Sequence, residues 1–213
     1  MMPFEDVAIQ LLDLPPICEE HVEPWVYDSL RTADLVWLVV TAEGPLEGLD
    51  LVERLLAERA IALTPVESAE EPADAGEPRP GWTSKKTLLV VTGLDRPGAA
   101  EDLEILDQLL DRPWPRVGVS TVTGEGLEEL ARRTFEALEV IRVYSKHPGR
   151  SADHAAPFTL EAGATVADLA RAVHQDLAAH FKFARLWGAH VFDGQKVHAS
   201  HVLEEGDVVE IHV

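Results

Sequence analysis

Three polar side chains follow apolar runs that have the length of buried strands. Asp13 ends the run AIQLLD, Asp95 ends LLVVTGLD, and Ser120 ends RVGVS. In an open parallel sheet, ligands bind beyond the carboxyl ends of the strands. Carboxylates and hydroxyls at such ends can accept hydrogen bonds from a ligand. We therefore expect a ligand site at this edge, although each residue alone is also typical of a turn.

The runs that carry these residues alternate with amphipathic helical patterns. The expected strands are Val7–Leu14, Asp34–Ala42, Lys86–Asp95 and Arg116–Thr121, and the expected helices are Glu23–Ala33, Leu46–Ile61, Gly98–Leu110 and Gly124–Val140. Near-continuous apolar strands are typical of a parallel sheet that is covered on both faces. Strands that alternate with helices predict an α/β doubly wound sheet.

Residues 64–84 interrupt this alternation. They hold four prolines (Pro65, Pro72, Pro78 and Pro80) and many acidic residues. Such a composition buries too little apolar surface to offset the entropy of ordering. We expect a mobile loop, with order resuming near Trp82.

The pattern changes near residue 140. Short alternating strands surround one amphipathic helix at Val166–Phe181, which predicts a small β-grasp (ubiquitin-like) domain. The charge changes as well, from −18 over residues 1–139 to −2 over residues 140–213, and eight of the nine histidines lie in the second part. We therefore predict two domains, 1–139 and 140–213.

The composition restricts the compartment and the partners that we expect for this chain. The chain has 213 residues, a net charge of −20 and one cysteine, Cys18, so that no internal disulfide can form. We expect a cytoplasmic protein. No apolar run reaches membrane-spanning length, so we expect no membrane segment. The acidic first part should repel nucleic acid, and we expect no DNA partner.

The order of these motifs resembles the Obg/DRG-type GTPases from their switch II region onward. IQLLDLPPI resembles the D-x-P-G region, VTGLD stands where the family has N-K-x-D, and VSTVTGEGLEEL stands where it has the S-A-x region and the following helix. Residues 140–213 are closely similar to the TGS domain that ends DRG-type GTPases. The resemblance implies an incomplete GTPase-like parallel sheet followed by a TGS domain.

The chain also departs from the family pattern. The phosphate-loop sequence G-x-x-x-x-G-K-[ST] occurs nowhere in the 213 residues, and GWTSKKT lacks its second glycine. That loop uses glycine backbone N–H groups and a lysine to hold the phosphates. The chain looks like the family with its front removed, through a shortened gene, a misplaced start or a shortened expressed chain. Pro16 stands where the family has a glycine whose N–H contacts the γ-phosphate, and proline has no N–H.

The resemblance assigns remnant nucleotide-binding roles to a small set of residues. It implies that Asp13 approaches Mg²⁺ through water where a complete site exists, and that Asp95 accepts from guanine N1–H and the exocyclic amine. Thr92 replaces the family asparagine, and Gly93 replaces the lysine that covers the base. The set is Asp13, Thr92, Asp95, Ser120 and Thr121.

The function implied is a GTP-binding regulator associated with ribosomes or translation, with Mg²⁺ as the cofactor of GTP. We expect this chain to bind GTP weakly or not at all, and to be inactive as a GTPase by itself. The alternative is a TGS module that contacts RNA or a protein without nucleotide. If RNA is the partner, we expect Lys182, Arg185 and Lys196 to contact phosphates.

Overall fold

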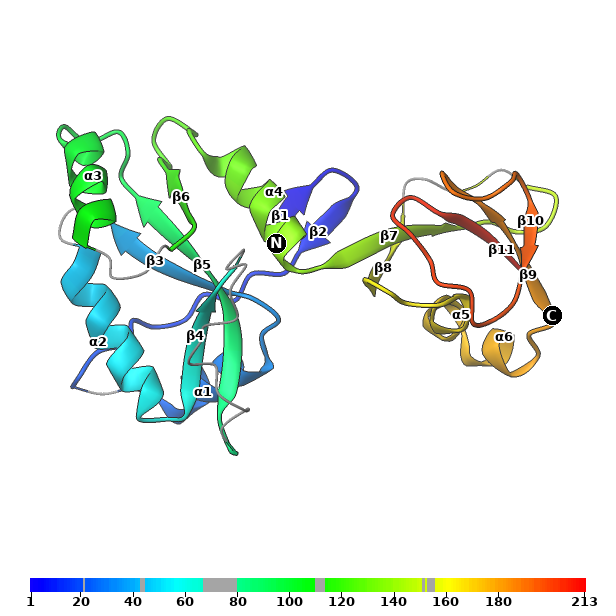
Figure 1. The fold of residues 1–213 in the computed structure, drawn as a ribbon, viewed down its shortest axis with the longest axis horizontal. Helices are drawn as coiled ribbons and strands as arrows, with labels where there is room; N and C mark the ends of the chain where they lie inside the picture. The colour runs from blue at the N-terminus through cyan, green and yellow to red at the C-terminus, as the bar shows by residue number, and fades with distance from the viewer. Residues whose placement is uncertain (21, 43–44, 67–79, 110–113, 151, 153–155) are drawn as a thin grey trace. The chain divides into compact units, whose positions relative to one another are not determined.

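The computed structural model describes residues 1–20, 22–42, 45–66, 80–109, 114–150, 152 and 156–213 (Figure 1). The chain divides into two compact units. One is Leu11–Leu138, and the other combines Met1–Gln10 with Glu139–Val213.

The unit Leu11–Leu138 is built on a parallel sheet. Its strands are β3 (Val36–Thr41), β4 (Ile61–Pro65), β5 (Thr83–Thr92) and β6 (Arg116–Val119). The long strand β5 pairs with the other three: with β4 along Thr83–Thr87, with β3 along Thr87–Thr92 and with β6 along Leu89–Thr92. The carboxyl ends of β3, β5 and β6 therefore lie at one edge of the sheet.

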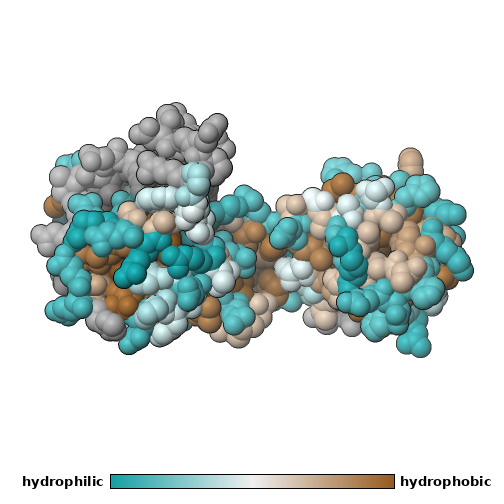
Figure 2. All heavy atoms as spheres, turned by 90° about the horizontal axis from the view of Figure 1, so that it is seen from below, coloured by the Kyte–Doolittle hydropathy of each residue, from teal (hydrophilic) through white to brown (hydrophobic). Residues whose placement is uncertain are grey.

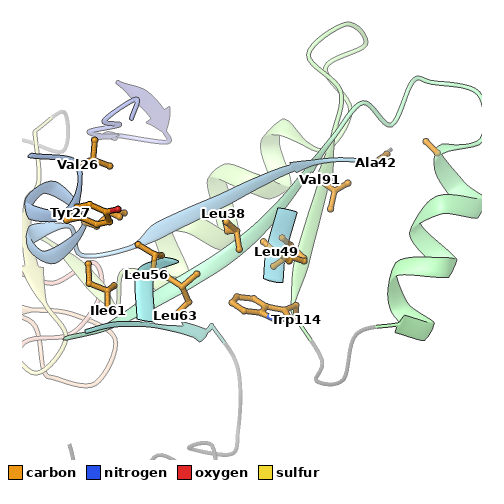
Figure 3. Close-up of a cluster of buried hydrophobic side chains, with 13 residues drawn as sticks. Val26, Tyr27, Leu38, Ala42, Leu49, Leu56, Ile61, Leu63, Val91 and Trp114 are labelled. Atoms are coloured by element: carbon orange, nitrogen blue, oxygen red, sulfur yellow. The ribbon is translucent and has the colours of Figure 1, made fainter. Parts of the chain in front are cut away.

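Helices cover both faces of this sheet. They are α1 (Pro24–Thr32), α2 (Pro45–Ala57), α3 (Ala99–Leu109) and α4 (Leu127–Ala137). Leu89 and Val91 of β5 belong to one buried cluster with residues of α1 and α2, whereas Val90 belongs to another with Leu130 of α4. Figure 3 shows members of the first cluster on the strands and helices that supply them. The predicted α/β parallel sheet is confirmed.

Three predicted segments have different bounds in the structure. The strand expected at Val7–Leu14 ends at Ile9, and Leu11 and Leu12 are 41% and 62% exposed. The helix expected at Leu46–Ile61 ends at Ala57, because a turn with Ala60 at φ 56° leads into β4. The ends of the loop expected at 64–84 lie in β4 and β5, whereas residues 67–79 lie outside the described residues.

The second unit contains the predicted β-grasp. Its strands are β7 (Val140–Ser145), β8 (Phe158–Glu161), β9 (Phe183–Trp187), β10 (Gln195–Val197) and β11 (Val208–His212), in the order β10-β9-β11-β7-β8. β7 and β11 are parallel, and the other neighbours are antiparallel. Val143, Leu186 and Val209 pack in one core with α5 (Val166–Val173).

The helix expected at Val166–Phe181 is two helices in the structure. His174 has extended backbone angles, φ −169° and ψ 139°, and it separates α5 from the short α6 (Gln175–Ala179). Its ring Nδ1 accepts from the Asp176 N–H at 3.2 Å, so the side chain caps the second helix. Helical spacing of apolar residues does not reveal such a break, because it continues through both helices.

A short hairpin completes the second unit. β1 (Met2–Phe4) pairs antiparallel with β2 (Val7–Ile9), and Glu5 and Asp6 form the turn between them (Figure 1). The sequence pattern did not indicate this hairpin, because Val7–Ile9 looks like the start of a longer strand.

The surface mixes polar and apolar residues. In the face shown in Figure 2, hydrophilic residues are interspersed with smaller hydrophobic areas. None of the helices in the described ranges is long and apolar enough to cross a membrane.

Candidate functional site

The carboxyl edge of the parallel sheet brings two loops together. The loop after β5 begins at Gly93, and the loop after β6 begins at Ser120. The Gly93 and Leu94 N–H groups donate to the Val119 carbonyl at 3.0 and 3.3 Å. These backbone bonds fix the first loop against the end of β6.

Ser120 and Asp95 meet at the junction of these loops. The Ser120 hydroxyl is buried and donates to Asp95 Oδ1 at 2.5 Å. The same hydroxyl accepts from the N–H groups of Val122 and Thr123 at 3.2 and 3.1 Å. Ser120 therefore connects its own loop to the carboxylate of the loop that follows β5.

The contact also sets the charge of the site. Two hydrogen bonds hold the pKa of Asp95 below its usual range. The larger effect comes from the Ser120 hydroxyl, and the smaller from a backbone hydrogen bond at Asp95 itself. Asp95 is exposed, so an ionised carboxylate faces solvent at the sheet edge. A carboxylate has two oxygens that can each accept more than one hydrogen bond, so acceptor capacity remains for a ligand.

Backbone geometry holds the second loop. The Ser120 N–H donates to the Glu125 carbonyl at 2.9 Å, and the Gly124 N–H donates to the Ser120 carbonyl at 2.9 Å. Gly126, with φ 74°, immediately precedes α4. A Cβ at Gly126 would lie 1.9 Å from the Gly118 carbonyl oxygen, so only glycine fits without a shift of the backbone.

The other predicted residues of this edge have different surroundings. The Thr92 hydroxyl donates to the Val40 carbonyl at 3.2 Å, which ties it to β3, and Thr121 is exposed in the second loop. Gly93 has φ 89°, and a Cβ built on it would lie 3.3 Å from Cδ and Nε of Arg96. Sequence reasoning missed Arg96; its signal was only its position one residue after Asp95.

Asp13 is not at the end of a strand. It is exposed in the coil between β2 and α1, as is Pro16. No group of three His, Cys, Asp or Glu side chains close enough to hold a metal ion occurs within the ranges that the structure describes. Mg²⁺ beside a nucleotide is usually held by one or two carboxylates together with waters and phosphates, so the role of Asp13 near Mg²⁺ stays a prediction.

A second candidate surface lies on the β-grasp sheet, on the side opposite its core. We call this the open face; its side chains are Arg142 and Tyr144 of β7, Phe183, Arg185 and Trp187 of β9, and Glu210 and His212 of β11. The neighbours that alternate with them, such as Val143, Leu186 and Val209, pack in the core. Alternation along strands places the two sets on opposite faces.

The open face pairs cations with rings. Lys196 Nζ lies 4.3 Å from the Phe183 ring centroid, and Lys146 Nζ lies 3.9 Å from that of Trp187. The Phe183 and His212 rings stack with centroids 4.3 Å apart. Sequence reasoning missed His212, because it did not show that β9 and β11 are neighbours.

Glu210 is the acidic residue of this network. It is 6% exposed and contacts Lys146 Nζ at 3.3 Å and His212 Nε2 at 2.7 Å. Burial would raise the pKa of Glu210, but the hydrogen bonds from His212 and Lys146 outweigh burial and leave the pKa below its usual range.

The predicted cations are exposed at this sheet. Arg185 lies on the open face opposite Lys196 in the register, and both are exposed. Lys182 is also exposed, and its N–H donates to the His212 carbonyl at 2.9 Å. The pair His198 and His201 does not belong to any metal-holding group found in the part of the chain that the structure describes.

The TGS domain family matches residues 141–213. A developmentally-regulated GTP-binding protein 2 homolog of Dictyostelium discoideum is 34% identical over 214 residues, which cover 98% of this chain and 55% of the relative. An uncharacterized GTP-binding protein of Methanocaldococcus jannaschii is 35% identical over 94 residues, covering 44% of this chain and 24% of the relative. The chain thus spans about a quarter to a half of the length of these two relatives.

A solved structure supports the fold. The YchF GTPase of Schizosaccharomyces pombe matches with a TM-score of 0.60 and 12% identity, covering 89% of this chain and 75% of that chain. Residues 141–213 therefore carry a TGS domain, and the chain as a whole is similar to developmentally-regulated GTP-binding proteins.

Proposed function

We propose that this chain is a regulatory protein of the GTP-binding type in which the guanine side of the site persists and the nucleotide binds weakly. The observation that carries this proposal is the buried Ser120 hydroxyl, which holds the exposed Asp95 carboxylate at the carboxyl edge of the sheet. Guanine presents two adjacent donors, N1–H and the exocyclic amine, and an ionised carboxylate can accept both. Adenine does not present this pair of donors.

The phosphate side supports weak binding. No phosphate-loop motif occurs in the 213 residues, and Pro16 has no N–H to donate. A hydrogen bond to a charged group contributes about 1.5–3 kcal/mol. Losing several such bonds leaves the base contacts to supply nearly all of the binding free energy. The same absence supports our proposal that the isolated chain does not hydrolyse GTP.

The test is a titration followed by amide NMR, with guanosine, adenosine and Mg²⁺–GTP as ligands. We expect guanosine to shift the amides of Gly93 and of the Ser120–Gly124 loop with a dissociation constant of about 1 mM, near −4 kcal/mol. Asp95→Asn should remove these shifts, whereas Glu125→Gln, with the same charge change at an exposed position, should keep them. A GTP dissociation constant near 1 μM would contradict weak binding, and equal shifts with adenosine would contradict guanine recognition.

A second function is favoured by a different observation. The cations and rings of the open face suit single-stranded RNA, whose bases stack on aromatic side chains while its phosphates contact Lys and Arg. We propose that the TGS domain contacts RNA, on the ribosome or elsewhere in the cytoplasm. The second unit also avoids the strong negative charge of residues 11–138, which would repel a polyanion.

This second proposal is tested with the full chain and a single-stranded RNA oligonucleotide. We expect binding that weakens steeply with salt, and a smaller salt slope when Lys182, Arg185 and Lys196 are all changed to Ala. A triple change of Lys85, Lys86 and Arg116 to Ala, in the other unit, is the matched control. Equal binding by the first variant would remove the RNA assignment and favour a protein partner.

A further inference from the structure

The turn of the N-terminal hairpin contacts the open face through its two carboxylates. Asp6 Oδ1 accepts from Arg142 Nη1 at 2.9 Å, and Asp6 Oδ2 accepts from the Tyr144 hydroxyl at 2.5 Å. Glu5 also pairs with Arg142 Nη1. The side chain of Arg142 is only 16% exposed beneath these contacts. A guanidinium and a hydroxyl on neighbouring positions of one strand face therefore hold a pair of oxygens.

The hairpin is small and lies outside the buried cores. Its strands have three residues each, and a hairpin of this size is not stable by itself in water. Its apolar residues are at most half-buried and belong to none of the three core clusters formed by the described residues. Glu5 has φ 49°, a left-handed conformation that is uncommon outside glycine. The carboxylate contacts therefore help to hold the hairpin on the sheet.

The hairpin also changes the charge of the open face. Arg142, Lys146, Arg185 and Lys196 supply four positive charges, and Glu205 and Glu210, which pair with Arg142 and Lys146, supply two negative charges. These six side chains have a net charge of +2, which falls to zero with Glu5 and Asp6 in place. The hairpin therefore neutralises the surface that a polyanion would approach.

We propose that Arg142 and Tyr144 form an oxyanion-binding pair for the phosphodiester group of single-stranded RNA, and that the hairpin occupies this pair as a competitor within the same chain. The oxygens of Asp6 stand in for two phosphate oxygens, because both groups present paired, negatively charged acceptors to Arg and a hydroxyl. RNA must displace Glu5 and Asp6 before it can use this end of the open face. The choice of RNA as the polymer rests on the RNA contact proposed for the TGS domain. The pairing of Arg142 and Tyr144 with an oxyanion does not depend on it.

The first experiment measures the hairpin without RNA. Hydrogen exchange of the Val7–Ile9 amides should be faster in Glu5→Gln/Asp6→Asn than in the wild type, by about tenfold. The control Glu20→Gln/Glu128→Gln changes the charge equally at exposed positions of the other unit and should leave this exchange unchanged. Inorganic pyrophosphate, titrated into the wild type at constant ionic strength, should also speed the exchange. Unchanged exchange in both the variant and the pyrophosphate series would overturn the proposal.

The second experiment measures binding of a single-stranded oligouridine to the full chain at low ionic strength. We expect Glu5→Gln/Asp6→Asn to tighten binding about tenfold and to steepen its salt dependence by about one phosphate contact, whereas the control should do neither. Tyr144→Phe, which keeps the ring, should remove most of the gain when it is added to the hairpin variant. Equal affinity of variant and control would overturn the competition.

The outcomes of the two experiments separate the proposals. If pyrophosphate releases the hairpin but oligouridine does not bind even the hairpin variant, the oxyanion pair is supported and the assignment to RNA is overturned. If oligouridine binds and the hairpin exchanges at the same rate throughout, the RNA contact of the TGS domain stands and the competition does not.

Discussion

The two candidate surfaces of this protein are held by different kinds of interaction. At the edge of the parallel sheet, backbone groups and one buried hydroxyl fix the loops, and Asp95 is the charged group that they present. On the open face of the β-grasp sheet, ion pairs and ring contacts between side chains from different strands define the surface. A site built from backbone contacts is disrupted when one of its glycines is substituted. In a network of side chains, each substitution removes only the contacts of that side chain.

The largest expected effect is that of Gly126→Ala. The added Cβ would meet the Gly118 carbonyl oxygen at 1.9 Å, and the residue would keep its left-handed φ of 74°. We expect the unfolding free energy of the unit Leu11–Leu138 to fall by about 3 kcal/mol, measured by urea denaturation. Gly124→Ala is the matched control, since it has φ 81° but open space around its Cβ. Equal losses in the two variants would show that the close approach does not matter.

The next effect is that of Ser120→Ala. This change removes the donor to Asp95 and leaves the Val122 and Thr123 N–H groups without their acceptor. We expect a loss of about 2 kcal/mol in unfolding free energy and a rise in the pKa of Asp95, followed by NMR titration of its carboxyl carbon. Thr123→Ala removes one exposed bond and should cost much less. An unchanged Asp95 titration would contradict the role of Ser120.

A substitution in the side-chain network of the open face should lower the unfolding free energy by a smaller amount. Lys146→Met removes the cation from the Trp187 ring and one partner from Glu210, but leaves the His212 contact. We expect a loss of about 1.5 kcal/mol, measured by thermal unfolding. Lys182→Met, at an exposed position beside the same sheet, is the control. A loss as large as that of Gly126→Ala would remove the distinction between the two surfaces.

The smallest expected effect is a pH-dependent change in stability at Asp207. Burial raises the pKa of Asp207, which is 4% exposed, so the folded state holds its proton at pH values where the unfolded state has lost it. Stability from this group is therefore present at low pH and is lost as pH rises above about 3.8 through the folded pKa. Asp207→Asn removes this loss, so its stability relative to the wild type should increase by about 1 kcal/mol between pH 4 and pH 7. A difference that stays constant with pH would contradict the assignment.

Local sequence patterns predicted much of this fold. The apolar runs at Lys86–Asp95 and Arg116–Thr121 and the helical spacing at Gly124–Val140 correspond to β5, β6 and α4. β5 is buried along Thr87–Val91, and α4 buries one face at Leu130, Ala131 and Thr134, so apolar residues mark both elements in the sequence. The meeting of Asp95 with Ser120 also followed from strand ends, since neighbouring parallel strands end at the same edge.

Pairing between distant segments was not predictable in the same way. The run Val7–Leu14 has the composition of a buried strand, yet only Val7–Ile9 pairs, and with Met2–Phe4. The contact of Asp6 with Arg142 joins positions that are 136 residues apart, and no local pattern announces it. The stack of Phe183 on His212 likewise depends on β9 and β11 being neighbours.

The membership of Met1–Gln10 in the second unit makes residues 11–138 an insertion between two parts of one folded body. During synthesis the hairpin emerges before its docking partners Arg142 and Tyr144, which follow more than a hundred residues later. Closing a loop of 136 residues costs about 4 kcal/mol of chain entropy beyond a constant term, if the intervening chain is unfolded. Prior folding of the inserted unit shortens the effective loop. The hairpin should therefore be the last part of the protein to acquire its native contacts.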